Sequence, residues 1–348
     1  MSLRLEVSSR LFHFKQPAGT SRGVYHTRRS WFVKATDERM PGKVGVGECA
    51  PLPQLSCDDL PHYTETLKTL CRQVERQDGV DYALMRPYPS MLFGIETALM
   101  MLHASDGVIY DTPFTRGEVG IPINGLVWMG NHGEMLQRME EKVEQGFSCV
   151  KLKIGAIGFD EELDLMKRLR QRFSPQVMEL RLDANGAFPA EDAPGILERI
   201  EPFGIHSIEQ PIRRGQWKEM AELCRRSPIP IALDEELIGV NIAGMKQQLL
   251  DTIRPAYIIL KPSLHGGLHG AREWIDMAGQ REVGSWVTSA LESNVGLNAI
   301  AQFAAHVYGC PLPMPQGLGT GLLFTDNVDG PISIEECKLV YHPLTTKS

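Results

Sequence analysis

The sequence lacks the cysteine patterns that build disulfide frameworks or structural zinc sites. Its seven cysteines are scattered and odd in number, and none forms a C-x-x-C pair. Disulfide-stapled domains and zinc modules carry their cysteines at regular, paired spacings. The sequence therefore predicts a protein of a reducing compartment, the cytoplasm, without a disulfide framework.

Long apolar runs and an excess of positive charge are also missing. No stretch of 18 apolar residues occurs, and residues Met1–Val7 alternate apolar and polar side chains instead of forming the apolar core of a signal peptide. The net charge is −7, whereas nucleic acids and anionic membranes attract clustered Lys and Arg. We expect a soluble protein from residue 1 that binds a small molecule and has no nucleic-acid or membrane partner.

The motifs of several common enzyme classes are absent as well. No G-x-G-x-x-G follows the first strand, as a dinucleotide-binding sheet requires. His265 and His269 do not form an H-E-x-x-H pattern, so we expect them in a loop or behind a site, not on a metal. Ser289 lacks the G-x-S-x-G elbow of a serine hydrolase, so we expect it to bind a carboxylate and not to act as a nucleophile.

The sequence does contain two parts with different patterns. Residues 1–120 predict an α+β domain, with strand-like alternation at 3–14 and 30–35 and helical periodicity at 63–77 and 91–103. From residue 121, short apolar strands alternate with amphipathic helices. The expected strands are 121–128, 149–154, 179–183, 207–210, 229–234, 257–261 and 285–289.

Strand–helix alternation predicts parallel strands, and seven or eight such units without a reversal predict a closed barrel. The expected fold is thus α/β, a (β/α)7–8 TIM-type barrel over residues 121–325 with an α+β N-terminal capping domain over residues 1–120. We expect the C-terminal residues 326–348 to join the capping domain. A doubly wound parallel sheet is the alternative.

Charged residues stand at the ends of five successive predicted strands, where a sheet covered on both faces should be apolar. They are Lys153, Asp183, Glu209, Asp234 and Lys261, separated by 30, 26, 25 and 27 residues. One unit of a barrel of roughly 250 residues takes roughly 30 residues. A single charged residue at a strand end usually forms a salt bridge, but five charged residues in register at the face where barrel active sites lie predict a catalytic site.

The order of these residues indicates the chemistry. Asp183, Glu209 and Asp234 offer hard oxygen donors without Cys or His, a set that suits Mg²⁺, or Mn²⁺, better than Zn²⁺. Lys153 and Lys261 flank them, one strand before and one strand after, and are expected to face each other across the metal. Such a site predicts proton abstraction with metal stabilisation of an enediolate.

The ordered motifs K-x-K, D-A-N, E-Q-P, D-E and K-P resemble the enolase superfamily, in its muconate-lactonising-enzyme-like subgroup. The resemblance covers nearly the whole chain. It implies a barrel with a capping domain, Lys153 and Lys261 as catalytic residues, and Mg²⁺ on the three carboxylates. It also places Lys151, Asn185 and Glu235 beside the site, in the same motifs.

Two features are more similar to the o-succinylbenzoate synthases of that subgroup than to other members. One is the loop Gly47–Pro53 with Ser56, and the other is Thr288–Ser293 followed by Gly296. Dipeptide epimerases usually carry Asp-x-Asp where this chain has Gly317-Leu318-Gly319. The resemblance implies dehydration of a cyclohexadiene carboxylate to o-succinylbenzoate, a step toward menaquinone, in which Lys153 takes the α-proton and Lys261 stabilises the enediolate.

Substrate contacts are expected from two further regions. Ser289 and Gly317 belong to predicted loops on the active face. Arg22 and Arg28 lie in the stretch from Gly19 to Arg29, which resembles the family's mobile specificity loop, and are expected to close over the substrate. Two other functions remain open: a racemase or epimerase of N-acylamino acids or dipeptides in the same superfamily, and a non-catalytic binding barrel.

Overall fold

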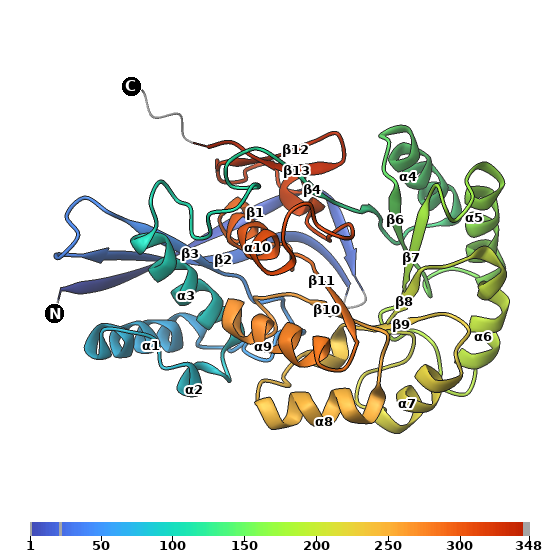
Figure 1. The fold of residues 1–348 in the computed structure, drawn as a ribbon, viewed down its shortest axis with the longest axis horizontal. Helices are drawn as coiled ribbons and strands as arrows, with labels where there is room; N and C mark the ends of the chain where they lie inside the picture. The colour runs from blue at the N-terminus through green and yellow to red at the C-terminus, as the bar shows by residue number, and fades with distance from the viewer. Residues whose placement is uncertain (1, 21–22, 344–348) are drawn as a thin grey trace.

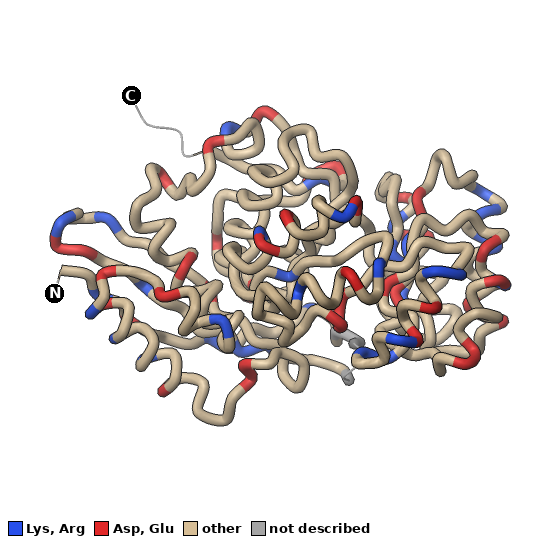
Figure 2. Tube along the Cα trace, turned by 60° about the horizontal axis from the view of Figure 1, so that its bottom comes forward, with Lys and Arg blue, Asp and Glu red and all other residues tan. Residues whose placement is uncertain are grey.

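The computed structural model describes residues 2–20 and 23–343, so Arg22 lies outside the described residues. Figure 1 shows two parts side by side, an antiparallel sheet with its helices and a curled parallel sheet wrapped by further helices. Figure 2 shows acidic and basic residues intermixed along both parts, in keeping with a chain of modest net charge. Within the described ranges, no helix combines the length and the apolar character needed to cross a membrane.

The N-terminal part is a three-stranded antiparallel sheet with helices packed against it. The strands occur in the order β1 (Leu3–Thr20), β2 (Gly23–Asp37) and β3 (Gly45–Cys49). The helices are α1 (Tyr63–Gln77), α2 (Tyr82–Met85) and α3 (Pro89–His103). The first two strands form one long hairpin, so the stretch from Gly19 to Arg29, predicted as a loop, is largely strand.

Glycines allow α3 to pack directly on β3. A Cβ atom added to Gly47 would lie 1.9 Å from the carbonyl oxygen of Gly94, and one added to Gly94 would lie 2.1 Å from Sγ of Cys49. Neither position accepts a larger residue without moving the helix away from the strand. This close approach fixes the position of Glu48, which lies between Gly47 and Cys49 on β3.

The second part is a parallel sheet of seven strands that follow one another in chain order. The strands are β5 (Gly125–Val127), β6 (Cys149–Lys153), β7 (Glu179–Asp183), β8 (Ser207–Glu209), β9 (Ile231–Leu233), β10 (Tyr257–Leu260) and β11 (Gly284–Val287). A doubly wound sheet reverses its strand order near the middle, and this sheet does not. The doubly wound alternative is therefore wrong.

Helices connect the parallel strands and cover the outside of the curled sheet (Figure 1). The α-helices are α4 (His132–Glu144), α5 (Phe159–Arg172), α6 (Ala193–Ile200), α7 (Trp217–Arg226), α8 (Ala243–Ile253), α9 (Gly267–Gly279) and α10 (Asn294–Tyr308). Short 3₁₀ turns are η1 (Glu201–Phe203), η2 (Glu235–Leu237) and η3 (Gly319–Leu322).

The predicted strand at 121–128 is divided between two sheets. β4 (Ile121–Pro122) pairs with β13 (Lys338–Tyr341), which pairs with β12 (Ile332–Glu335), whereas β5 joins the parallel sheet. Pro122 has no N–H to donate, which favours an edge position. Just before β12 in the chain, the Asp326 side chain accepts a hydrogen bond from the backbone N–H of His13 on β1.

The segment Gln316–Gly317 lies between the two ends of the curled sheet. Gly317 forms a parallel bridge with Thr288 beyond β11, and Gln316 forms one with Ile123 just before β5. Inside the sheet, the Arg181 guanidinium lies 4.4 Å from the Trp286 ring centroid and donates to the Pro315 carbonyl at 3.0 Å. The side chains of Arg181 and Trp286 thus fill part of the interior of the curled sheet.

Candidate active site

A cavity of about 460 Å³ opens at the carboxyl ends of the parallel strands. Its walls come from both parts of the chain, because Tyr25, Leu52 and Leu55 of the N-terminal part line it together with the strand ends. Most of the residues singled out from the sequence also line it, namely Lys151, Lys153, Asp183, Asn185, Glu235, Lys261, Ser289 and Gly317. The remaining walls are largely apolar, so the cavity suits a small organic molecule with a charged end.

The register of the parallel strands brings the charged residues together. Lys153 is the Cα partner of Asp183, and Asp183 is the partner of Glu209. Asp234 and Lys261 each follow directly after the last residue of β9 and β10. Because the three carboxylates are nearly inaccessible to solvent, each needs a positive partner or a proton.

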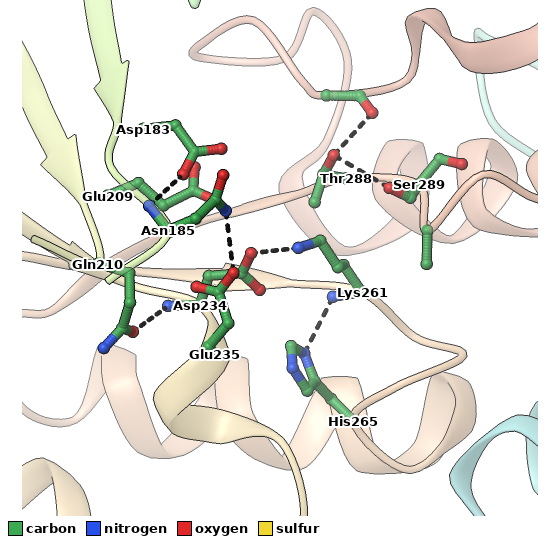
Figure 3. Close-up of polar contacts among 12 residues, drawn as sticks. Asp183, Asn185, Glu209, Gln210, Asp234, Glu235, Lys261, His265, Thr288 and Ser289 are labelled. Carbon is green, nitrogen blue, oxygen red and sulfur yellow. Dashed lines mark hydrogen bonds and ion pairs between the residues drawn. The ribbon is translucent and has the colours of Figure 1, made fainter. Parts of the chain in front are cut away.

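Lysine ammonium groups are those partners in this structure. Lys153 Nζ donates to Asp183 Oδ2 at 2.9 Å and to Asn185 Oδ1 at 2.7 Å. Lys151 Nζ lies 2.9 Å from Asp183 Oδ2 and also donates to Glu209. On the other side, Lys261 donates to Asp234, as Figure 3 shows. The carboxylates thus stand between lysines that enter from two directions.

The charges shift the pKa values of these groups in opposite directions. Burial alone would raise the pKa of Asp183, but the ammonium groups of Lys151 and Lys153 outweigh it and lower that pKa. Burial raises the pKa of Glu209, with the negative charge of Asp183 acting in the same direction, and burial also raises the pKa of Asp234. The lysines therefore outweigh burial at Asp183 but not at Glu209 or Asp234.

The carboxylate oxygens of this cluster are the kind of donor that a divalent cation prefers. Buried oxygens of Glu209 (Oε1), Asp234 (Oδ1) and Glu235 (Oε2) have no hydrogen-bond partner. A buried carboxylate oxygen without a partner is costly, and a hard cation would satisfy it. As placed, however, the His, Cys, Asp and Glu side chains of residues 2–20 and 23–343 form no three-donor metal cluster, and Lys151 and Lys261 pair with Glu209 and Asp234.

Asn185 links the two sides of the site. Its Oδ1 accepts from Lys153, and its Nδ2 donates to Glu235 at 2.9 Å. Its φ of 46° lies in the left-handed region, which Asn tolerates better than most residues. This explains why an asparagine, two residues after Asp183, reaches back over the strand end.

Sequence reasoning gave no role to Gln210, which follows Glu209. Its Oε1 accepts from the backbone N–H groups of Asp234 and Glu236, at 3.3 and 3.1 Å. Its side chain therefore holds the turn that carries Asp234 (Figure 3). The E-Q-P motif contains this signal, but a single sequence does not reveal which backbone a glutamine will contact.

His265 lies behind the site, as the sequence predicted. Its Nδ1 accepts a hydrogen bond from the backbone N–H of Lys261 at 3.0 Å (Figure 3), and burial lowers its pKa well below the usual value. A neutral ring that accepts at Nδ1 carries its proton on Nε2. His265 thus fixes the backbone of Lys261 and does not face the cavity.

Arg28 is placed differently from the expectation. It is 4% exposed, it does not line the cavity, and its guanidinium donates to the carbonyl of Ala50 at 2.5 Å. Burial lowers its pKa, against the opposing attraction of Glu292 and Glu48. The prediction that Arg28 closes over a substrate is corrected: Arg28 supports the loop after β3 from behind. The matching prediction for Arg22 falls outside the described residues.

A curled parallel sheet with lysines and carboxylates at its carboxyl ends defines the class to which the chain belongs. Residues 134–338 match the family described as enolase C-terminal domain-like. The chain is 44% identical to o-succinylbenzoate synthase of Desulfotalea psychrophila over 92% of this chain and 94% of that protein. The chain therefore belongs to the enolase superfamily.

Solved structures agree with this assignment. The crystal structure of MenC from Desulfotalea psychrophila superposes with a TM-score of 0.84 at 40% identity, covering 98% of this chain and 100% of the other. An o-succinylbenzoate synthase from Thermosynechococcus elongatus, complexed with Mg in its active site, gives 0.71 at 24% over 90% and 92%. The L-Ala-D/L-Glu epimerase of Bacillus subtilis gives 0.80 at 22% over 98% and 96%. The latter two show a shared fold.

Proposed function

We propose that this protein is an o-succinylbenzoate synthase, a hydro-lyase that converts 2-succinyl-6-hydroxy-2,4-cyclohexadiene-1-carboxylate to o-succinylbenzoate and water in menaquinone biosynthesis. The observation that carries the proposal is the 44% identity to such an enzyme over 92% of the chain. The site supports it, because two lysines from different strands line one largely apolar cavity.

Lys153 is the proposed base. As a neutral amine, it takes the proton from the ring carbon that bears the carboxylate, and the electron pair left behind forms the new ring double bond. The C–O bond to the ring hydroxyl then breaks, and Lys153 returns the proton to the departing hydroxide, which leaves as water. Asp183 and Asn185 hold its Nζ through the two hydrogen bonds described above, so the amine is positioned before the substrate arrives.

Lys261 is the proposed electrostatic partner. The carboxylates of Asp234 and Glu209 outweigh the effect of burial and raise its pKa, so it remains an ammonium group. A fixed positive charge in a buried site stabilises the negative charge that develops as the α-proton leaves. Lys151, Asn185 and Glu235 are proposed to organise the charges around the two lysines, and Ser289 and Gly317 to contact the substrate.

The proposed ligands of a divalent cation are Asp183, Glu209 and Asp234, which stand on or just after three neighbouring strands. The unpartnered oxygens of Glu209 and Asp234 support this assignment. Mg²⁺ is the proposed ion, with Mn²⁺ as a possible substitute, since both prefer oxygen donors. Such a cation would bind the substrate carboxylate and withdraw negative charge from it.

The proposal includes the architecture. The curled sheet is proposed to be a (β/α)7–8 TIM-type barrel over residues 121–325, closed through Gln316–Gly317, and the bridges of these residues to Ile123 and Thr288 support this. Residues 1–120 form the proposed capping domain, with residues 326–348 joining it. The contact between Asp326 and His13 supports that junction.

The assay mixes the purified protein with Mg²⁺ and the cyclohexadiene substrate and follows the ultraviolet change as the ring becomes aromatic. A parallel reaction offers an N-acylamino acid and a dipeptide in ²H₂O and measures exchange of the α-proton. Ring aromatisation at enzymatic rates is expected. Rapid exchange of the dipeptide without aromatisation would instead establish an epimerase, and inactivity toward all three compounds would indicate a binding barrel.

A further inference from the structure

Glu48 of the N-terminal sheet reaches across to the barrel and binds the start of helix α10. Its side chain is fully buried. Oε1 accepts from the backbone N–H of Ser293 at 3.0 Å, and Oε2 accepts from the Ser293 hydroxyl at 2.6 Å and from the N–H of Gly296 at 3.0 Å. The first N–H groups of a helix have no partner within the helix, so a carboxylate there is strongly bound.

Glu292, the residue before Ser293, binds the part of the chain that forms the cavity wall. Glu292 Oε2 accepts from the Ser289 hydroxyl at 2.5 Å and from the backbone N–H of Ala290 at 2.7 Å. Its Oε1 accepts from the hydroxyl of Ser263, two residues after Lys261. Ser289 and Ala290 line the cavity, and Glu292 is buried behind them.

The side chains of Glu292 and Glu48 therefore bind opposite sides of the segment 289–296. Glu292 joins the cavity side of this segment to the loop after Lys261, and Glu48 joins its far side to the N-terminal part of the chain. Thr320 adds a third contact, since its hydroxyl donates to Ser289 Oγ at 2.8 Å. A shift of the Glu48 contact would move the start of α10 and, with it, the wall that Ser289 belongs to.

Glu48 is itself held firmly. It lies on β3 beside Gly47, whose close contact with α3 leaves the strand no room to move. The buried Arg28 guanidinium attracts both Glu48 and Glu292, which reduces the cost of placing two carboxyl groups in the same interior region.

We propose that Glu48 is a positioning residue for the reaction: it sets the cavity wall at Ser289–Leu291 through the start of α10, without touching the substrate. This inference rests on the proposed function. It makes the N-terminal part a determinant of the substrate site through a contact that spans 245 positions of the chain. A role limited to stability would instead lower the melting temperature and leave substrate binding unchanged.

The test compares Glu48→Gln with a matched control. Glutamine keeps the size and one acceptor oxygen but turns an amide N–H toward the donors of α10. KM for the cyclohexadiene substrate is expected to rise about fivefold, with a smaller loss in kcat, because a misplaced wall weakens binding first. Amide hydrogen exchange in peptides that cover 288–297 is expected to accelerate.

The control is Glu273→Gln. Glu273 on α9 also joins the two parts of the chain, through an ion pair with Arg86 at 2.8 Å, but it does not line the cavity or contact residues 288–293. Its loss is expected to leave both KM and exchange in 288–297 at wild-type values. A KM increase of equal size in the control would overturn the inference, since any loosening between the parts would then suffice.

A second variant retains the side chains of both Glu48 and Glu292. A Cβ atom at Gly296 would lie 3.0 Å from Glu48 Oε2 and 2.8 Å from Glu292 Cβ, so Gly296→Ala crowds the same contact and is expected to change KM and exchange in the same direction. Unchanged KM and exchange in both variants, with only a lower melting temperature, would overturn the inference. Because exchange is measured without turnover, a wild-type protein that fails to form o-succinylbenzoate would overturn the proposed function and leave the exchange test of Glu48 intact.

Discussion

At the scale of single residues, Lys153 and Lys261 enter the cavity from different strands and differ in their surroundings. Lys153 is held by Asp183 and by the amide of Asn185. Lys261 is paired with Asp234, and His265 fixes its backbone. The first arrangement suits a group that exchanges a proton with the substrate, and the second suits a permanent positive charge.

Replacing Lys153 by alanine is expected to lower kcat by about 10²–10⁴-fold, the usual contribution of general acid–base catalysis. The fold should survive, because the side chain lies at a strand end and contributes little to the core. Steady-state kinetics measure the loss in kcat, and circular dichroism checks that the fold survives. Lys167→Ala, on the exposed face of α5 in the same strand–helix unit, serves as the control with wild-type activity. Exchange of the substrate α-proton at the native rate in Lys153→Ala would refute the assignment of the base.

Two substitutions of Lys261 separate charge from proton transfer. Arginine keeps the positive charge but is not a usable base, and methionine keeps a similar length without charge. An electrostatic role predicts that Lys261→Arg retains part of the activity and exceeds Lys261→Met by at least about tenfold in kcat/KM. Equal, near-complete loss in both variants would indicate that Lys261 transfers a proton.

At the scale of elements, buried carboxylates of the N-terminal part bind the starts of helices that cover the curled parallel sheet. Glu96 on α3 accepts from the backbone N–H groups of Leu268 and His269, at 2.7 and 3.0 Å, at the start of α9. Glu48 does the same at the start of α10. The helices after β10 and β11 are therefore anchored by side chains from the N-terminal part, and these are the helices that follow Lys261 and Ser289.

The stability contributed by Glu96 is expected to depend on pH. Burial raises the pKa of Glu96 from 4.5 to about 7. Between these values the folded protein holds a proton that the unfolded chain has lost, so the contribution is complete below about pH 4.5 and is lost as the pH rises to about 7. The loss is on the order of 3 kcal/mol at about 1.4 kcal/mol per pH unit.

Urea unfolding at pH 5 and pH 8 tests this difference. Wild type is expected to lose more stability between the two values than Glu96→Gln, in which the titrating group is removed. Glu273→Gln is the control: its ion pair with Arg86 lowers the pKa of Glu273 to about 2, so its difference from wild type should stay constant over this range. An identical pH response in wild type and Glu96→Gln would contradict the prediction.

The spacing of apolar residues predicted most of the helices and strands, because the apolar face of an element depends on residues close together in the sequence. The helix at 63–77 and the strand at 179–183 have the bounds expected from the sequence. The division of 121–128 between two sheets was not predictable, since it depends on pairing with β13, more than 200 residues away. The five charged strand ends were predictable because parallel strands align their carboxyl ends at one face.

The positions that the sequence did not predict depend on distant partners. Arg28 was expected at the cavity mouth, where a long charged side chain in a polar stretch would normally lie, but Ala50, Glu48 and Glu292 draw it into the interior. Gln210 and Glu48 likewise act through backbone groups far along the chain. A single sequence shows what a side chain can bond to but not which group folding brings to it.

At the scale of the whole molecule, the two parts of the chain share one cavity and are joined around it by buried polar contacts. Leu52 and Leu55 of the N-terminal part contribute an apolar wall, and the strand ends of the curled parallel sheet contribute the charged residues. Removing either part would expose the lysines and carboxylates to water, where their interactions weaken. A substrate site of this kind exists only in the complete fold.

The cluster of buried charged residues at the strand ends should also make global stability depend on a divalent cation. Asp183, Glu209 and Asp234 belong to three neighbouring strand ends, and buried oxygens of Glu209 and Asp234 have no hydrogen-bond partner, so the cluster offers oxygen donors to a cation. A cation that binds only the folded state stabilises it by about 2.7 kcal/mol at a concentration of about 100 Kd.

Adding Mg²⁺ to protein stripped with EDTA is therefore expected to raise Tm. The increase should largely disappear in Asp234→Asn and persist in Asp58→Asn, which alters an equally buried aspartate of the N-terminal part that accepts a hydrogen bond from Ser90 at the start of α3. Because each variant is compared with itself before and after Mg²⁺, its own loss of stability does not affect the result. An undiminished Tm increase in Asp234→Asn would place the cation elsewhere and remove the metal from this site.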